Sequence, residues 1–148
     1  MSDPQAAAEI RALVEGYAVA ADTLDAELFR SLWTADAELT IHRGGEQTGH
    51  YDGVDDMPRL IDTLRSRYRH TVHVVGSHRV ALRDDGRLAV GVTSGVGHHI
   101  GPVDGGPAWN RQIGLRYIDG FRLEDGAWRL ASRQCHQLWQ VENAVEAS

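Results

Sequence analysis

The sequence predicts an α+β fold in which a curved antiparallel sheet wraps around N-terminal helices. Apolar residues recur at helical spacing in the N-terminal part of the chain, whereas the C-terminal half reads as strands separated by turn-forming residues. The length of 148 residues and the 42% content of hydrophobic residues suit one globular domain. Because helices and strands are segregated along the chain, we expect the helices to cover one face of the sheet. Such a bent sheet forms a cone with an internal pocket for a small apolar ligand.

Three amphipathic helices form the predicted α part of the fold. Asp3 and Pro4 are typical of an N-cap and a first turn, and the first helix is expected to end at Asp22. A shorter helix is predicted within 28–33 and a third within 53–67. The apolar face of the first helix consists of Ile10, Leu13, Val14, Tyr17 and Ala21.

The predicted strands form a small hairpin between the helices and then a four-strand antiparallel meander. In the hairpin, Gly44-Gly45 turns the chain between strands at 37–42 and 48–53. The turn sequences RDDGR, GPVDGGP and EDG separate the later strands, which are expected at 71–82, 88–100, 109–123 and 127–139.

Composition excludes several classes of function. The formal net charge of −6 argues against a nucleic-acid surface, because phosphate binding needs a basic patch. The single cysteine, Cys135, allows no intrachain disulfide. The sequence contains no apolar run of membrane-spanning length, and its N-terminus MSDPQAAAEI lacks the pattern of a secretory signal. We therefore expect a cytoplasmic protein with no nucleic-acid or membrane partner.

His73 interrupts an apolar strand in the stretch RYRHTVHVVG (67–76). Histidine titrates near neutrality, so such a residue can serve as a base without extreme tuning of its pKa. The same position also suits a structural histidine that is hydrogen-bonded to a core carboxylate. The eight histidines of the chain raise the question of a metal, but no ligand set at metal-binding spacing is found, and no metal or cofactor is expected.

Three stretches resemble the SnoaL-like branch of the nuclear-transport-factor-2-like superfamily, which has the cystatin-like cone fold. They are IRALVEGYAVAADTLDAELFRSLWTADAELTI, HTVHVV and RYIDGFRLEDGAWRLASR. The resemblance covers roughly residues 8–140 and implies a single domain within 1–148. The family holds dehydratases, isomerases, epoxide hydrolases, polyketide cyclases, dehydrochlorinases and non-catalytic binding proteins, so the fold alone does not identify the activity.

The resemblance also implies site residues. In scytalone dehydratase, bile-acid 7α-dehydratase and hexachlorocyclohexane dehydrochlorinase, an aspartate that closes the first helix pairs with a histidine on the third strand, and Asp22 and His73 match these positions. Tyr17 stands five residues before Asp22, as a tyrosine does in the bile-acid enzyme. The second histidine of scytalone dehydratase falls near His98 and His99. The loosest match is Arg133, as an arginine that the last strand carries into the pocket.

These residues would suit an elimination reaction. His73 would take a proton from carbon, and Asp22 would fix the tautomer of its ring. Tyr17 would donate a hydrogen bond to an oxygen of the substrate, and His98 or His99 would act as a second acid. Only one of these two histidines can face the pocket, because neighbouring residues of a strand point to opposite faces.

Each assignment has a structural alternative. Asp22 could simply cap a helix end, Tyr17 could be a core residue, and His98-His99 could be an exposed pair beside a loop. Arg133 could instead form an ion pair with Glu124 or Asp119 on the sheet. Cys135 reads as a small sheet residue rather than a nucleophile.

The sequence thus predicts a cofactor-independent lyase of the dehydratase type that acts on a small alicyclic, steroid-like or polyketide-like substrate. An isomerase or a cyclase with the same base, and a non-catalytic domain that binds small molecules, remain alternatives. Apolar residues on both faces of the last two strands favour a homodimer or homotrimer. The side chains expected to bind the substrate are Trp109, Tyr51, Phe29 and Trp33.

Overall fold

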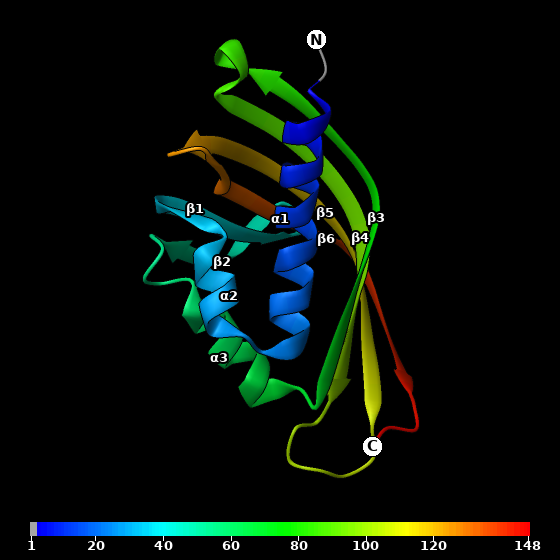
Figure 1. The fold of residues 1–148 in the computed structure, drawn as a ribbon. Helices are drawn as coiled ribbons and strands as arrows, with labels where there is room; N and C mark the ends of the chain where they lie inside the picture. The colour runs from blue at the N-terminus through cyan, green and yellow to red at the C-terminus, as the bar shows by residue number, and fades with distance from the viewer. Residues whose placement is uncertain (1–2) are drawn as a thin grey trace.

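Helix α1 (Pro4–Thr23) lies along the concave face of a curved sheet in the computed structural model, which describes residues 3–148 (Figure 1). The Asp3 side chain caps the helix by accepting hydrogen bonds from the backbone of Gln5 and Ala6. At the other end, Leu24 adopts a left-handed conformation (φ 55°), and its N–H bonds back to the last turn. The predicted apolar face of α1 is buried, so this helix is fixed to the sheet by packing.

Two shorter helices complete the layer on the concave side (Figure 1). Helix α2 (Ala26–Ser31) begins at Asp25, whose carboxylate accepts from the backbone N–H of Leu28. Helix α3 (Pro58–Arg67) starts five residues later than the sequence predicts, because residues 54–57 form turns. Trp33, which the periodicity places in a helix, instead begins a strand and pairs with Leu130. None of the described helices is both long and apolar enough to cross a membrane.

The sheet has six strands in the order β2-β1-β6-β5-β4-β3. All neighbouring strands are antiparallel except β1 and β6, which run parallel, so the sheet is mixed rather than fully antiparallel. The predicted meander of β3 to β6 is present, and its last strand returns beside the first strand of the chain. The strands are β1 (Trp33–Arg43), β2 (Glu46–Asp52), β3 (His70–Arg83), β4 (Leu88–Gly101), β5 (Trp109–Glu124) and β6 (Ala127–Ala144).

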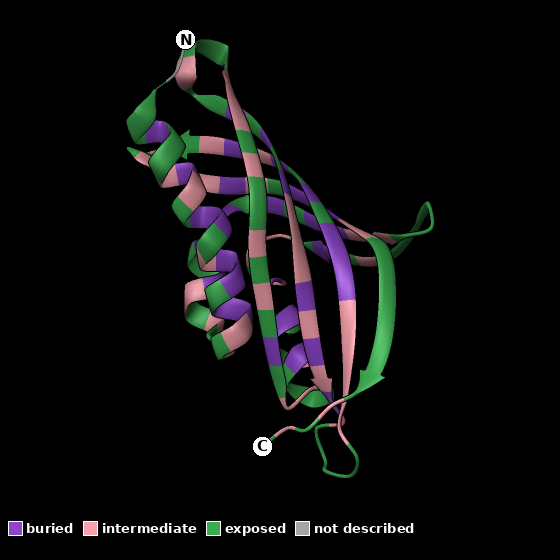
Figure 2. Cartoon of the chain, turned by 90° about the vertical axis from the view of Figure 1, so that its right-hand side faces the viewer, coloured by how far each residue is buried: buried purple, intermediate pink, exposed green. Residues whose placement is uncertain are grey.

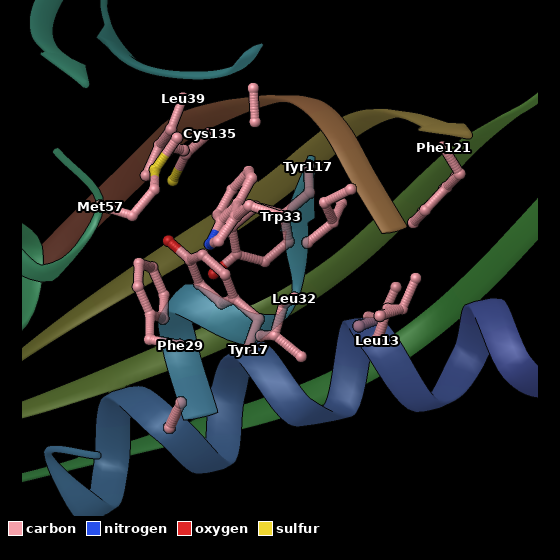
Figure 3. Packing of buried hydrophobic residues seen from close by; sticks show 14 of the residues in the cluster. Leu13, Tyr17, Phe29, Leu32, Trp33, Leu39, Met57, Tyr117, Phe121 and Cys135 are labelled. Atoms are coloured by element: carbon pink, nitrogen blue, oxygen red, sulfur yellow. The ribbon is translucent and has the colours of Figure 1, made fainter. Parts of the chain in front are cut away.

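Buried and exposed residues alternate along the strands, as Figure 2 shows on the side that the helices do not cover. Between α1 and the sheet the core contains a group of aromatic rings (Figure 3). The ring of Tyr17 lies 5.1 Å from that of Phe29 and 5.6 Å from that of Tyr117, in tilted and edge-on arrangements that aromatic pairs favour. The ring of Tyr17 therefore packs against other aromatic rings of the core.

Arg133 and Asp119 form a fully buried ion pair beside these rings. Arg133 Nε and Nη2 each donate to one carboxylate oxygen of Asp119 at 2.8 Å, and both side chains have no exposed surface. The guanidinium carbon lies 4.3 Å from the ring centre of Tyr17 and 4.0 Å from that of Tyr117. Of the roles considered for Arg133, the structure therefore shows the ion pair with Asp119 on the sheet.

We expect Arg133→Met to lower the free energy of unfolding by about 3–5 kcal/mol, because the substitution leaves the buried Asp119 carboxylate without its partner. Urea denaturation followed by circular dichroism measures this loss. The matched control is Arg122→Met, since Arg122 is paired with Asp36 on the surface and should contribute no more than about 1 kcal/mol. A loss for Arg133→Met as small as that of the control would contradict the prediction.

Candidate functional site

A cavity of about 440 Å³ lies between α3 and the inner face of the sheet, at the end where α1 meets β3. Tyr17, Tyr51, His73 and His99 supply polar groups to its wall. The wall combines aliphatic side chains with many polar and charged ones, and a concave site of this kind can hold a small molecule. The aliphatic part of the wall consists of Ala21, Ile41, Leu60, Leu64, Ile113 and Leu115.

Asp22 and His73 meet at the edge of this cavity. Asp22 lies in the last turn of α1, and its Oδ1 is 2.7 Å from Nδ1 of His73 on β3. Its Oδ2 accepts the backbone N–H of His73 at 2.8 Å, and Oδ1 also accepts from the hydroxyl of Thr71 at 3.0 Å. The carboxylate therefore holds both the ring and the backbone of His73 in place.

The state of Asp22 follows from these contacts. Burial alone would raise the pKa of the Asp22 carboxyl, but the hydrogen bonds from His73 and Thr71 outweigh burial and lower this pKa below its usual value. An ionised carboxylate can only accept, so Nδ1 of His73 carries a proton. In the neutral ring, Nε2 is then the basic nitrogen, and it is the one that remains for a ligand in the cavity.

His99 faces the cavity on β4, whereas its neighbour His98 lies on the opposite face and accepts a hydrogen bond from the Asn110 amide at 2.9 Å. Nδ1 of His99 lies 3.1 Å from the backbone carbonyl of Arg111. A carbonyl can only accept, so this nitrogen carries the proton and Nε2 is an acceptor. Burial, together with the nearby His73, lowers the pKa of His99 to about 4. His99 is thus neutral at pH 7 and is arranged as an acceptor rather than as the second acid that the sequence suggests.

Gly97 allows the rings of His73 and His99 to lie close together. Their centroids are 5.3 Å apart in an edge-on arrangement. A Cβ atom on Gly97 would lie 2.8 Å from the His99 ring and 3.2 Å from the His73 ring, closer than side chains normally approach. Sequence reasoning missed this residue, although the glycines of β4 all fall on one face of the strand (Gly91, Gly95, Gly97 and Gly101).

The other candidate residues divide between the cavity and the core. Tyr17 lines the cavity, and burial raises the pKa of its hydroxyl well above the ordinary value, so the hydroxyl stays protonated and can donate. Tyr51 also lines the cavity, beneath the guanidinium of Arg59. Phe29 and Trp33 are buried in the core instead of lining the cavity.

The positions of Trp109, Arg133 and Cys135 relative to the cavity also follow from the structure. Trp109 packs against Tyr68 and over Gly101 and is not among the residues that line the cavity. Arg133 also lies outside this set, behind Tyr17. Cys135 does line the cavity, and burial raises the pKa of its thiol to about 12, which keeps the thiol protonated.

Comparison with known proteins agrees with this fold. Residues 4–134 match the family of SnoaL-like domains. A hexachlorocyclohexane dehydrochlorinase, LinA type 2, superposes with a TM-score of 0.79 at 20% identity over 95% of this chain and 89% of its own. A scytalone dehydratase-like protein of Novosphingobium aromaticivorans gives 0.77 at 16% identity over 95% and 89%. No curated protein matches the sequence. At such identities the structural likeness shows the fold alone.

We expect the stability of the protein to fall as the pH drops from about 6.5 to about 4, partly because of His99. Its folded-state pKa lies below the ordinary value, so the unfolded chain binds the proton more readily in this range and is favoured. The contribution of this residue amounts to roughly 3 kcal/mol. His99→Asn keeps a donor for the Arg111 carbonyl but cannot titrate.

Urea denaturation of wild type and His99→Asn at a series of pH values measures this effect. As the pH falls from about 6.5 to about 4, the free energy of unfolding of wild type should decrease more than that of His99→Asn. Equal pH profiles for the two proteins would show that His99 is not the titrating group.

Proposed function

Since the chain belongs to the SnoaL-like domain family, we propose that it is a cofactor-independent lyase that eliminates water from a small cyclic substrate. The observation that carries the proposal is the contact between Asp22 and His73 at the wall of the cavity. Two structural neighbours bear the names dehydrochlorinase and scytalone dehydratase, and both names describe eliminations. Asp22 and His73 provide the base that an elimination requires.

In the proposed reaction, Nε2 of His73 removes a proton from a carbon atom next to a carbonyl group. The electron pair of that C–H bond forms the new double bond as the hydroxyl group leaves the adjacent carbon. The imidazolium is stabilised by the Asp22 carboxylate and returns its proton to the leaving hydroxide, so that one water molecule is released. The ring ends in its starting state, and neither an oxidant nor a second reactant is consumed.

Tyr17 and His99 would hold the substrate on either side of this base. The Tyr17 hydroxyl remains protonated and would donate to the carbonyl oxygen, where negative charge develops as the proton leaves carbon. Nε2 of His99 would accept the hydrogen of the departing hydroxyl group and so orient it. A donor for the carbonyl and an acceptor for the hydroxyl together favour a cyclic β-hydroxy ketone as the class of substrate.

We expect His73→Ala to reduce the turnover number by about a hundredfold to ten-thousandfold while the fold is retained. Asp22→Asn should reduce the turnover number more than it changes KM, because the amide no longer fixes the tautomer of His73. The assay follows the loss of one water from a panel of cyclic β-hydroxy ketones by mass spectrometry.

His98→Ala is the matched control, since His98 lies on the opposite face of β4, and it should turn over like wild type. Wild-type rates for His73→Ala would refute the assignment of the base. A product of unchanged mass would identify the reaction as an isomerisation or cyclisation with the same base instead of a dehydration.

We also propose that the outer face of the sheet joins two or three copies of the chain. Val72 and Val74 on β3, Val90 and Val92 on β4, and Ile118 on β5 are about half exposed and point away from the helices. Val92 and Ile118 are directly paired in the register of the two strands, so the apolar surface is continuous. An apolar patch of this kind on a soluble domain usually marks a protein interface.

Val92→Glu should therefore convert the wild-type oligomer into a monomer of 16.3 kDa, because a buried carboxylate without a partner is costly at an interface. Light scattering coupled to size-exclusion chromatography gives the mass. Val19→Glu is the control, since Val19 is equally exposed on α1, away from the sheet, and this variant should keep the wild-type mass. A wild-type protein that is already monomeric would refute the proposed interface.

A further inference from the structure

The cavity has a charge opposite to that of the protein as a whole. The chain carries a formal net charge of −6, with 21 acidic and 15 basic residues. Four arginines nevertheless line the cavity, and no aspartate or glutamate of residues 3–148 is among its lining residues. The carboxylate of Asp22 contacts His73 but does not line the cavity, because three hydrogen bonds hold it toward β3. The four arginines are Arg43, Arg59, Arg67 and Arg111.

Two of these arginines are compensated by carboxylates outside the cavity. Arg59 donates to both carboxylate oxygens of Asp56 at 2.9 Å and lies over the ring of Tyr51. Arg111 reaches Glu142 at 3.3 Å. These two arginines add little net charge to the cavity, because each is already paired.

Arg43 and Arg67 lack a carboxylate partner among the described residues. Arg43 donates from Nε and Nη2 to a single neutral acceptor, the side-chain oxygen of Gln137, at 2.9 and 2.6 Å. Gln137 also lines the cavity, so this contact orients the guanidinium without neutralising it. Arg67 makes no side-chain hydrogen bond or ion pair with residues 3–148. The positive charges of Arg43 and Arg67 are therefore available to interact with a ligand in the cavity.

These charges come from two elements that face each other across the cavity. On α3, Arg59, Thr63 and Arg67 are spaced four residues apart and form one stripe along the helix that lines the cavity. On the sheet, Arg43 and Gln137 are direct neighbours in the register of β1 and β6. His73 and His99 lie on the same face of the sheet but on β3 and β4, toward its other edge.

We propose that the substrate carries an oxyanion, a carboxylate or a phosphate ester, which Arg43 and Arg67 bind while the ring to be dehydrated lies against His73. This inference deepens the proposed function and rests on it, because it names the substrate class of the same cavity. A guanidinium presents parallel N–H groups that fit two oxygens of such a group. The aliphatic wall between the arginines and the histidines suits the hydrocarbon skeleton of a polycyclic or alicyclic acid.

Binding of unreactive probes tests the proposal separately from catalysis. Naphthylacetate, its neutral analogue naphthylacetamide, and naphthyl phosphate are titrated into the protein by calorimetry at about 50 mM and about 500 mM salt. We expect at least one of the two anions to bind about tenfold or more tightly than the amide, since a charge-assisted hydrogen bond contributes that much. The preference should shrink at high salt because the arginines lie near the solvent. Which anion binds more tightly distinguishes a carboxylate from a phosphate ester.

The variant Arg43→Gln/Arg67→Gln should lose the preference for the anion while still binding the amide. Arg65→Gln is the matched control, because Arg65 lies on the same helix, pairs with Asp62 and does not line the cavity. His73→Ala should keep the preference, so a failed catalytic assignment would leave this result unchanged. The proposal is overturned if neither anion binds more tightly than the amide, or if the double variant behaves like Arg65→Gln.

Discussion

The Asp22 carboxylate is the interaction on which the candidate site depends. Its oxygens accept from the ring and the backbone of His73 and from the hydroxyl of Thr71, so one side chain at the end of α1 fixes the start of β3. Partial burial disfavours the charged form of this carboxylate, and these three donors keep it charged. The same hydrogen bonds that attach the helix to the sheet therefore also set the proton on Nδ1 and free Nε2 of the histidine.

Two histidines that lie side by side acquire different properties from their neighbours. Both carry a proton on Nδ1, but His73 shares it with a carboxylate and His99 shares it with a backbone carbonyl. Burial, together with the neighbouring His73, lowers the pKa of His99, so that His99 remains neutral down to a pH of about 4. In the proposed reaction, His73 takes up and returns a proton while His99 stays an acceptor.

Much of the fold and part of the site could be predicted from local patterns. The apolar spacing in α1, the end of that helix near Asp22 and the strands of the meander follow from sequence signals that act over a few residues. The parallel pairing of β1 with β6 has no such signal, because its partners lie about a hundred residues apart, as do Arg43 and Gln137. The tautomer of His99 depends on a carbonyl of the neighbouring strand, and no sequence pattern encodes that contact.

The position of β6 also bears on how the chain reaches its folded state. This strand follows the other five in the sequence, yet it lies in the middle of the sheet, and among the described strands it alone joins β1 and β2 to the others. Until it docks, the N-terminal hairpin has no partner in the sheet, and the wall formed by Ile41 and Cys135 does not exist. A nascent chain therefore acquires the complete cavity only after β6 has emerged from the ribosome and docked between β1 and β5.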